Sequence, residues 1–163
     1  MTMRRKDRQQ TREFALNILQ NCEYAVLSTV GEDGMPYAVP VSPVMCGDFV
    51  YIHCAPEGRK LDNIRFNKNV CLVCVGKTRL LPEKYTTEYE SAISFGECEI
   101  IEDETEKIFA LRKLCEKYAP NNMDAFDAAI QRSLHRTAIC KISIKEISGK
   151  AKVAKKSSDT QAS

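Results

Sequence analysis

Apolar residues near the start of the chain recur at the spacing of an α-helix. Phe14, Ile18 and Cys22 lie four residues apart, and Ala15 and Leu19 repeat the same interval beside them. Residues three and four apart share one face of a helix, so this spacing predicts a helix with one buried side. We expect that helix over residues 7–21.

A β-rich segment, residues 24–30, follows this helix and ends at the polar residues 31–34. The Asp33-Gly34 pair predicts a type I′ hairpin turn, because both central residues of such a turn need a positive φ. Residues 35–44 are then the returning strand, although they include three prolines. Proline has no N–H to donate to a neighbouring strand, so this strand must lie at a sheet edge or bulge for part of its length.

The rest of the chain alternates short strands and helices, except that residues 77–89 are polar and show no clear pattern. The predicted elements are strands at 49–54, 69–75, 91–101 and 137–147, and helices at 56–67, 103–120 and 123–134. The second of these helices begins with a capping box and ends at a proline. Six strands separated by turns and brief helices predict a small, mostly antiparallel barrel with helical insertions.

The composition supports one domain with an apolar core, because 44% of the 163 residues are hydrophobic and 28% are charged. We assign this domain to residues 1–150 and expect residues 151–163 to form a disordered basic and polar tail. No apolar run approaches the roughly 20 residues of a membrane helix, and no apolar segment follows the basic start as in a secretory signal. We therefore expect a cytoplasmic protein with no membrane partner, whose eight cysteines are reduced.

Charge is distributed unevenly along the chain. Residues 1–12 carry five cations and one carboxylate, and residues 150–163 carry four cations and one carboxylate, so the segment between them is acidic. Basic ends could contact nucleic acid, but no aromatic residues are interleaved with them as base stacking requires. We favour solvated termini and expect no nucleic-acid partner.

Cys71 and Cys74 form a CxxC pattern, which in other settings marks a metal or redox site. Here the pattern lies inside a predicted strand, where residues three apart face opposite sides of the sheet. Redox pairs lie instead at a helix start, which stabilises the thiolate. We interpret both cysteines as buried structural thiols, and the other six show no paired metal-ligand spacing.

One internal window reverses the sign of the acidic body. Residues 59–84 carry seven cations against two carboxylates, and a predicted helix begins there at Gly58, followed by Arg59 and Lys60. Free N–H groups at a helix start, the helix dipole and two cations together favour a bound anion. The window therefore points to a phosphate site, with simple solvation of the cations as the alternative. No glycine-rich nucleotide loop and no hydrolase motif occurs.

The ordered set of segments resembles one known family. The sequence Arg-Arg-Lys-Asp-Arg at residues 4–8 is similar to the opening of the nitroimidazole-resistance (Nim-type) proteins, which are FMN-binding split-barrel flavoproteins related to pyridoxamine 5′-phosphate oxidase. Similar segments follow in the same order at residues 25–29, 33–41, 51–55, 58–62, 69–71 and 90–96. The resemblance covers about residues 3–150.

The resemblance implies a mostly β protein with α insertions: a six-stranded antiparallel FMN-binding split barrel with peripheral helices. It also implies a homodimer with FMN at the subunit interface. The implied cofactor-binding residues are Pro40, Val41, Ser42, His53, Ala55, Gly58, Arg59, Lys60, Tyr89, Glu90 and Ser91.

The resemblance also suggests a role for each group of these residues. Val41 and Ser42 would contact the edge of the isoalloxazine ring, and His53 would lie beside the flavin. Residues 58–60 would hold the phosphate, and residues 89–91 would approach from the second subunit. No catalytic residue is implied, because the flavin carries the chemistry and the protein supplies binding and electrostatics.

Three functions are compatible with these observations. The first is an FMN-dependent oxidoreductase that passes electrons from NADH or NADPH to a small-molecule acceptor such as a 5-nitroimidazole. The second is a flavin- or haem-binding protein of the same fold without efficient turnover, in which His53 would matter as an axial ligand. The third is a nucleic-acid-binding protein that uses its basic ends.

Overall fold

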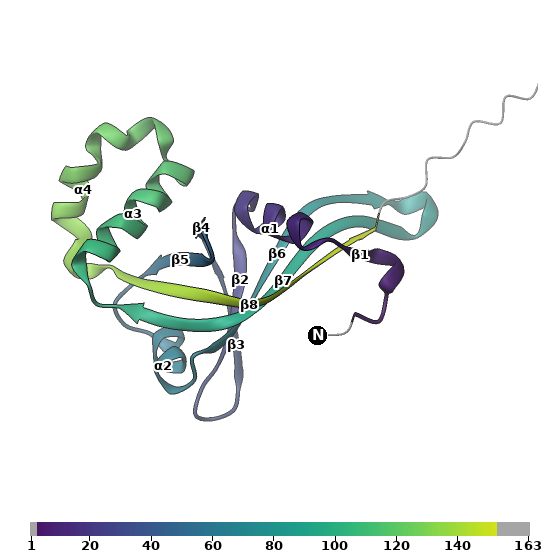
Figure 1. Ribbon diagram of the computed structural model, residues 1–163, viewed down its shortest axis with the longest axis horizontal. Coiled ribbons are helices and arrows are strands. Elements are labelled where there is room, and N and C mark those ends of the chain that lie inside the picture. The colour runs from purple at the N-terminus through teal and green to yellow at the C-terminus, as the bar shows by residue number, and fades with distance from the viewer. Residues whose placement is uncertain (1–2, 153–163) are drawn as a thin grey trace, which may run out of the picture.

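The computed structural model describes residues 3–152 as a twisted antiparallel sheet with helices packed against it (Figure 1). The strands are β1 (Gln9–Gln10), β2 (Ala25–Val30), β3 (Pro36–Val41), β4 (Val44–Cys46), β5 (Phe49–Cys54), β6 (Asn69–Leu81), β7 (Thr86–Ile101) and β8 (Ala138–Lys152). The α-helices are α1 (Arg12–Asn21), α2 (Arg59–Phe66), α3 (Glu104–Tyr118) and α4 (Phe126–Ser133). Short 3₁₀ helices span Lys6–Arg8, Pro82–Lys84, Pro120–Ala125 and Leu134–Arg136.

The strands form one sheet in the order β3-β2-β6-β7-β8-β5-β4, and β1 adds to β8. The predicted mostly β antiparallel architecture with peripheral helices is confirmed, but the sheet has eight strands rather than six. One extra strand arises because the predicted strand 35–44 breaks at Ser42 and Pro43 into β3 and β4, which lie at opposite edges of the sheet. The carbonyl of Pro43 accepts from Lys117 Nζ at 2.8 Å and from Tyr118 Oη at 2.7 Å, so helix α3 satisfies the backbone at this break.

The proline-containing strand lies at an edge, as predicted. Pro36 and Pro40 belong to β3, whose one neighbour is β2, so the missing N–H groups interrupt no ladder between two strands. The preceding turn differs from a type I′ turn. Gly34 has a φ of 71° and donates to the Gly31 carbonyl at 3.0 Å, whereas Asp33 keeps a negative φ and uses its carboxylate to accept from the Met35 N–H.

The first helix is shorter than predicted, because Thr11 caps it. Thr11 Oγ1 accepts from the Phe14 N–H at 3.2 Å, which starts α1 at Arg12 rather than at residue 7. Residues 6–10 instead form a 3₁₀ turn and β1, which pairs with Gly149 and Lys150 of β8. The described part of the basic N-terminus is therefore packed against the sheet and is not merely solvated, contrary to expectation.

The C-terminal prediction is wrong in part. Ala151 and Lys152 belong to β8 and pair with β7, so they are not tail. Residues 153–163 of the predicted tail lie outside the described residues.

Strands β6 and β7 are longer than predicted because residues 78–81 and 86–89 pair with each other as a hairpin. Thr86 to Tyr89 carry polar side chains, so no alternation of apolar residues announces this pairing in the sequence. Gly96 allows β7 to approach β8 closely, since a Cβ at this position would lie 2.2 Å from the Ser143 carbonyl oxygen. The β7–β8 register shifts there.

Two apolar cores organise the molecule. The larger lies against α1 and α2 and includes Leu19, Leu27, Ile52 and Leu72. The smaller lies under α3 and α4, near the end of β7 and the start of β8 (Figure 1). Asp103 caps α3 as predicted, accepting from the Glu106 N–H at 2.7 Å. Among residues 3–152, no helix combines the length and the apolar character needed to cross a membrane.

Candidate functional site

Helix α2 is seated on the β2–β3 hairpin by a buried polar contact. Asn63 Nδ2 donates to Thr29 Oγ1 at 2.9 Å, and both side chains are buried. A Cβ at Gly31 would lie 2.6 Å from Asn63 Oδ1, so a glycine is required for this close approach. Because buried polar groups must find hydrogen-bond partners, this contact fixes the position of α2 against the sheet.

The start of α2 presents an anion-binding arrangement. Gly58 precedes the helix with a φ of 126°, a conformation that favours glycine, and no side chain caps the helix. Arg59 and Lys60 form its first turn. The unpaired N–H groups and the helix dipole make this end positive, and the two cations add to it. We call Gly58, Arg59 and Lys60 the α2 start.

Arg59 is held by groups that an anion can displace. Its Nη2 lies 3.0 Å from Asp33 Oδ2, and its guanidinium carbon lies 5.6 Å from the centroid of the Tyr37 ring. About half of each charged side chain is exposed, so solvent screens the pair and it stabilises the fold only weakly. The guanidinium is thus positioned near the helix start without being locked to a buried partner.

Ser42 and His53 line the same cavity, which has a volume of about 470 Å³. Helices α3 and α4 supply most of its other walls, including Leu111, Tyr118 and Phe126. No Lys, Arg, Asp or Glu lines this cavity within the part of the chain that the structure describes. The site therefore combines a largely apolar wall with uncharged polar groups, among them the Ser42 hydroxyl and the His53 imidazole.

His53 is an exposed residue, but the groups around its imidazole lower the pKa of the ring. Desolvation by neighbouring atoms lowers its pKa below the ordinary value of 6.5, and repulsion from Lys60 lowers it further. At neutral pH the ring therefore carries one donor and one acceptor nitrogen. A loop of four residues, 55–58, joins the end of β5 to α2, so the α2 start follows His53 closely along the chain.

The other predicted cofactor-binding residues between 40 and 60 lie next to Ser42, His53 and the α2 start along the chain. Pro40 and Val41 end β3, opposite Val26 and Ala25 of β2, and lead directly into Ser42. Ala55 follows β5 in the exposed loop that connects it to α2. The structure thus connects the predicted residues between 40 and 60 around one cavity and one helix start.

Residues 89–91 of the predicted site lie elsewhere. Ser91 in β7 pairs with Lys150 near the end of β8, whereas His53 pairs with Ile139 near its beginning. Eleven residues of β8 separate these two points, which corresponds to about 36 Å along an extended strand. Figure 1 shows α2 and the β6–β7 hairpin at opposite ends of the sheet. One chain therefore does not bring Tyr89, Glu90 and Ser91 to the cavity.

Several residues of the site were missed by sequence reasoning. The sequence predicts helices at 103–120 and 123–134 but gives them no part in the site, although Leu111 and Phe126 line the cavity. Arg8 was counted as part of a solvated terminus, although its Nη1 donates to Tyr89 Oη at 3.3 Å. Both contacts join distant segments, so no local spacing could have indicated them.

The cysteines of the CxxC pattern lie on β6, where Cys71 pairs with Phe95 and Cys74 with Ala92. Cys74 is buried beside Cys22, and this contact together with desolvation raises its pKa far above that of a free thiol. The buried Cys74 agrees with a structural role, whereas Cys71 is half-buried and its predicted burial is wrong in part. Within residues 3–152 no group of three or more His, Cys, Asp or Glu side chains is arranged to hold a metal ion.

Solved structures with the same fold come from several bacteria. A candidate 5-nitroimidazole antibiotic resistance protein from Bacteroides thetaiotaomicron is 25% identical, with a TM-score of 0.73, over 87% of this chain and 84% of that one. The flavocytochrome Anf3 from Azotobacter vinelandii is 22% identical, with a TM-score of 0.79, over 94% of this chain and 73% of that one.

A FAD- and haem-binding protein from Mycobacterium smegmatis is also similar, with 21% identity and a TM-score of 0.78 over 90% of this chain and 74% of that one. No curated protein sequence matches the chain. The family model for pyridoxamine 5′-phosphate oxidase matches residues 11–151, which is most of the sequence. The chain therefore belongs to the pyridoxamine 5′-phosphate oxidase family.

Proposed function

We propose that this chain binds flavin mononucleotide (FMN) and acts as an FMN-dependent oxidoreductase of the nitroimidazole-resistance type. The observation that carries the proposal is the uncapped, cationic start of α2, which a four-residue loop joins to strand β5, where His53 lines a largely apolar cavity. A phosphate group next to a planar ring system is the ligand that such a pair of sites suits.

The residues present fit both parts of FMN. The α2 start offers free N–H groups and two cations to the phosphate, and Arg59 can leave Asp33 for it. The cavity wall offers apolar surface to the ring, while the Ser42 hydroxyl and the His53 imidazole can orient its polar edge. The peptide of Val41 lies next to Ser42 at the end of edge strand β3.

The proposal includes a homodimer. Tyr89, Glu90 and Ser91 are the residues that the family resemblance assigns to the second subunit. Their separation from His53 by about 36 Å of strand β8 means that a second copy must supply them if they contact the same flavin.

When bound, FMN supplies the redox chemistry by taking a hydride from NADH or NADPH and passing electrons to a small acceptor such as a 5-nitroimidazole. The chain contributes binding and electrostatics. The Ser42 hydroxyl can donate to negative charge that develops at the ring edge, and the neutral His53 can donate one hydrogen bond without adding charge. The 25% identical structure from Bacteroides thetaiotaomicron, described as a candidate nitroimidazole resistance protein, supports this choice of acceptor.

Titration of flavin fluorescence tests the phosphate site. The double variant Arg59→Ala with Lys60→Ala is expected to weaken FMN binding about tenfold or more, because two charge-assisted contacts are lost. Riboflavin, which lacks the phosphate, should bind both proteins equally. The matched control is Arg65→Ala with Lys68→Ala, which removes the same charge beyond the helix start. Equal FMN affinity in wild type and the Arg59–Lys60 variant would contradict the proposal.

Anaerobic stopped-flow absorbance tests the reaction. Wild-type protein loaded with FMN should lose its flavin absorbance on mixing with NADH or NADPH and regain it when a 5-nitroimidazole is added. A flavin that stays oxidised with both nicotinamides would favour a binding protein without turnover.

The second candidate function is haem binding, which His53 on its apolar cavity wall favours. A neutral imidazole is the form that ligates iron, and the lowered pKa of His53 keeps it available. Haem titration should then produce a Soret band that His53→Ala abolishes and that Ser42→Ala retains. A Soret band unaffected by His53→Ala would rule out this ligand.

A further inference from the structure

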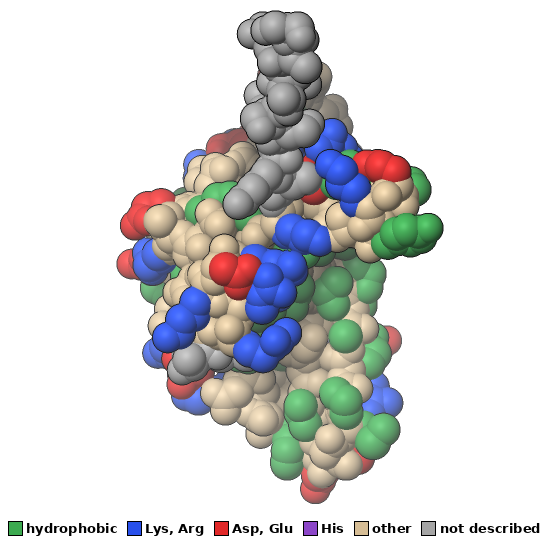
Figure 2. Space-filling model, turned by 90° about the vertical axis from the view of Figure 1, so that its right-hand side faces the viewer, with side chains coloured by type: hydrophobic (Ala, Val, Ile, Leu, Met, Phe, Trp, Pro, Cys, Tyr) green, Lys and Arg blue, Asp and Glu red, His purple; other side chains and the backbone are tan. Residues whose placement is uncertain are grey.

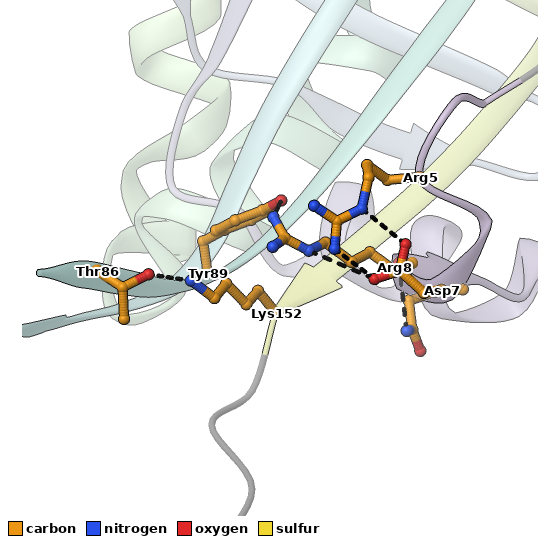
Figure 3. Close-up of polar contacts among 7 residues, drawn as sticks. Arg5, Asp7, Arg8, Thr86, Tyr89 and Lys152 are labelled. Atoms are coloured by element: carbon orange, nitrogen blue, oxygen red, sulfur yellow. Dashed lines mark hydrogen bonds and ion pairs between the residues drawn. The ribbon is translucent and has the colours of Figure 1, made fainter. Parts of the chain in front are cut away.

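The basic N-terminal segment forms a defined structure at the end of the sheet opposite α2. Arg5 and Arg8 are half-buried there beside the last residues of β8, because β1 pairs with Gly149 and Lys150. Figure 3 shows Arg8 reaching Tyr89 of β7, whereas Arg5 pairs with Asp7 and Lys152 of β8 contacts Thr86. We call Arg5, Arg8, Tyr89 and Lys150 the Tyr89 cluster.

The hydroxyl of Tyr89 is surrounded by cations. Arg8 Nη1 donates to Tyr89 Oη at 3.3 Å, and Lys150 Nζ lies 5.8 Å from the centroid of the Tyr89 ring. Burial raises the pKa of this hydroxyl, but hydrogen bonds to Arg8 and Lys150 outweigh burial and lower it overall. Since Oη already accepts from Arg8, its own proton is free to be donated to a further acceptor.

The carboxylates nearby are engaged with other groups. Arg5 Nε donates to Asp7 Oδ1 at 2.7 Å and its Nη2 binds Asp7 Oδ2, whereas Arg8 Nε lies 3.9 Å from the same carboxylate. Glu88 pairs with Arg79 at 2.6 Å, and Glu90 accepts from the backbone N–H of Lys77 at 3.3 Å. Arg8 and Lys150 therefore face a neutral hydroxyl as their closest shared partner.

The surface beside this cluster is accessible. Tyr89 lines a cavity of about 370 Å³ together with Lys77, Arg79 and Lys152 and with the carboxylates Glu88 and Glu90. Arg8 and Lys150 are outside this lining and contact Tyr89 itself. Figure 2 looks onto this end of the molecule and shows Lys and Arg side chains gathered on it. Two cations that contact one phenolic donor supply the kinds of group that bind the oxygens of a phosphate.

We propose that Arg8, Tyr89 and Lys150 form a second anion site, which holds the phosphate group of a nucleotide. The N-terminal segment is then part of the functional site through Arg8. The inference rests on the proposed function for the source of the phosphate. That source is either the FMN bound by the partner subunit, beside which Tyr89 would lie, or the nicotinamide dinucleotide that reduces it.

Paired ligands that differ by one phosphate distinguish the two sources. The full chain is titrated with FMN and riboflavin by flavin fluorescence, and with NADP⁺ and NAD⁺ by calorimetry. In the variant Arg8→Gln with Lys150→Gln we expect about tenfold weaker binding of one phosphorylated ligand, with its unphosphorylated partner unchanged. A loss for FMN identifies the flavin phosphate, and a loss for NADP⁺ identifies the 2′-phosphate of the dinucleotide.

The matched control is Arg132→Gln with Arg136→Gln, which removes two exposed cations at the α4 end and should leave all four affinities unchanged. Tyr89→Phe removes the hydroxyl alone and should weaken the same phosphorylated ligand by a smaller factor, which keeps the test valid if the double variant unfolds. Equal losses of affinity for FMN and riboflavin, or for NADP⁺ and NAD⁺, would overturn the proposal. Unchanged affinity for both FMN and NADP⁺ would overturn it as well. The proposal would also be overturned if the Arg8→Gln with Lys150→Gln variant lost only salt-dependent binding of duplex DNA.

The two proposals fail in different ways. If wild-type protein binds neither FMN nor riboflavin, the proposed function is wrong, and the NADP⁺ titration still decides whether the Tyr89 cluster is an anion site. If FMN binding depends on Arg59 and Lys60 but no phosphorylated ligand responds to Arg8 and Lys150, only the second anion site is wrong.

Discussion

The α2 start and the Tyr89 cluster are both cationic, but they are assembled differently. The α2 start consists of three consecutive residues, Gly58 to Lys60, whose anion affinity follows from the geometry of any helix start. The Tyr89 cluster joins segments near residues 8, 89 and 150, which meet only because β1 and β7 both pair with β8. A site made of consecutive residues can therefore be predicted from the sequence, whereas a site assembled by strand pairing cannot.

The two regions also differ in the donors that they offer. The α2 start has backbone N–H groups that no side chain caps, so part of its attraction for an anion is fixed by the helix. In the Tyr89 cluster the strand peptides pair within the sheet, so side-chain charges carry the attraction. We therefore expect anion binding at the Tyr89 cluster to weaken more steeply with salt.

The largest effect is expected from removing the buried hydrogen bond that holds α2 against the β2–β3 hairpin. Asn63→Ala removes the buried donor to Thr29 Oγ1 and should cost about 1–3 kcal/mol of the free energy of unfolding. FMN affinity should fall with it, while anion binding at the Tyr89 cluster should persist. Urea unfolding measures the stability, and the flavin fluorescence and NADP⁺ calorimetry titrations measure the two affinities. Asn121→Ala, at an exposed position, is the control and should change stability by less than about 0.5 kcal/mol.

A smaller effect, of opposite sign, is expected from releasing Arg59. Asp33→Asn removes the carboxylate 3.0 Å from the guanidinium but keeps an oxygen to accept from the Met35 N–H. Exposed ion pairs are worth about 0.2–1 kcal/mol, so FMN should bind about 1.5- to 5-fold more tightly. Flavin fluorescence titration measures the change. An unchanged or weaker affinity would mean that Arg59 does not reach the phosphate.

The smallest effect is expected in the pH dependence of stability. Because the folded pKa of His53 lies below 6.5, the unfolded chain takes up this proton first as pH falls. Wild type should therefore lose stability relative to His53→Gln as pH falls through about 6.5, and the difference should become constant below the folded pKa. Urea midpoints from pH 8 to pH 5 test this, and a constant difference over the whole range would show that the imidazole is not perturbed.

The sequence predicted those elements that local signals define. The capped helix after Asp103, the strand Phe49–Cys54 and the edge position of the proline-containing strand were all predicted from residues within each segment. The polar hairpin at residues 77–89 was missed, because its strands are held by pairing with each other and carry no apolar alternation. Likewise, nothing near Pro43 showed that the strand would break there and that Lys117 and Tyr118 would bind its carbonyl.

The sequence by itself determined the mostly β antiparallel class, the helix start at Gly58 with its two cations, and the placement of Cys71 and Cys74 within a strand. These features depend on interactions between residues close in the chain. The tertiary structure alone decided that α3 and α4 wall the cavity beside His53, that Asn63 seats α2 on Thr29, and that Arg8 reaches Tyr89. Each of these contacts joins segments far apart in the sequence, and their geometry exists only once strand order and register are set.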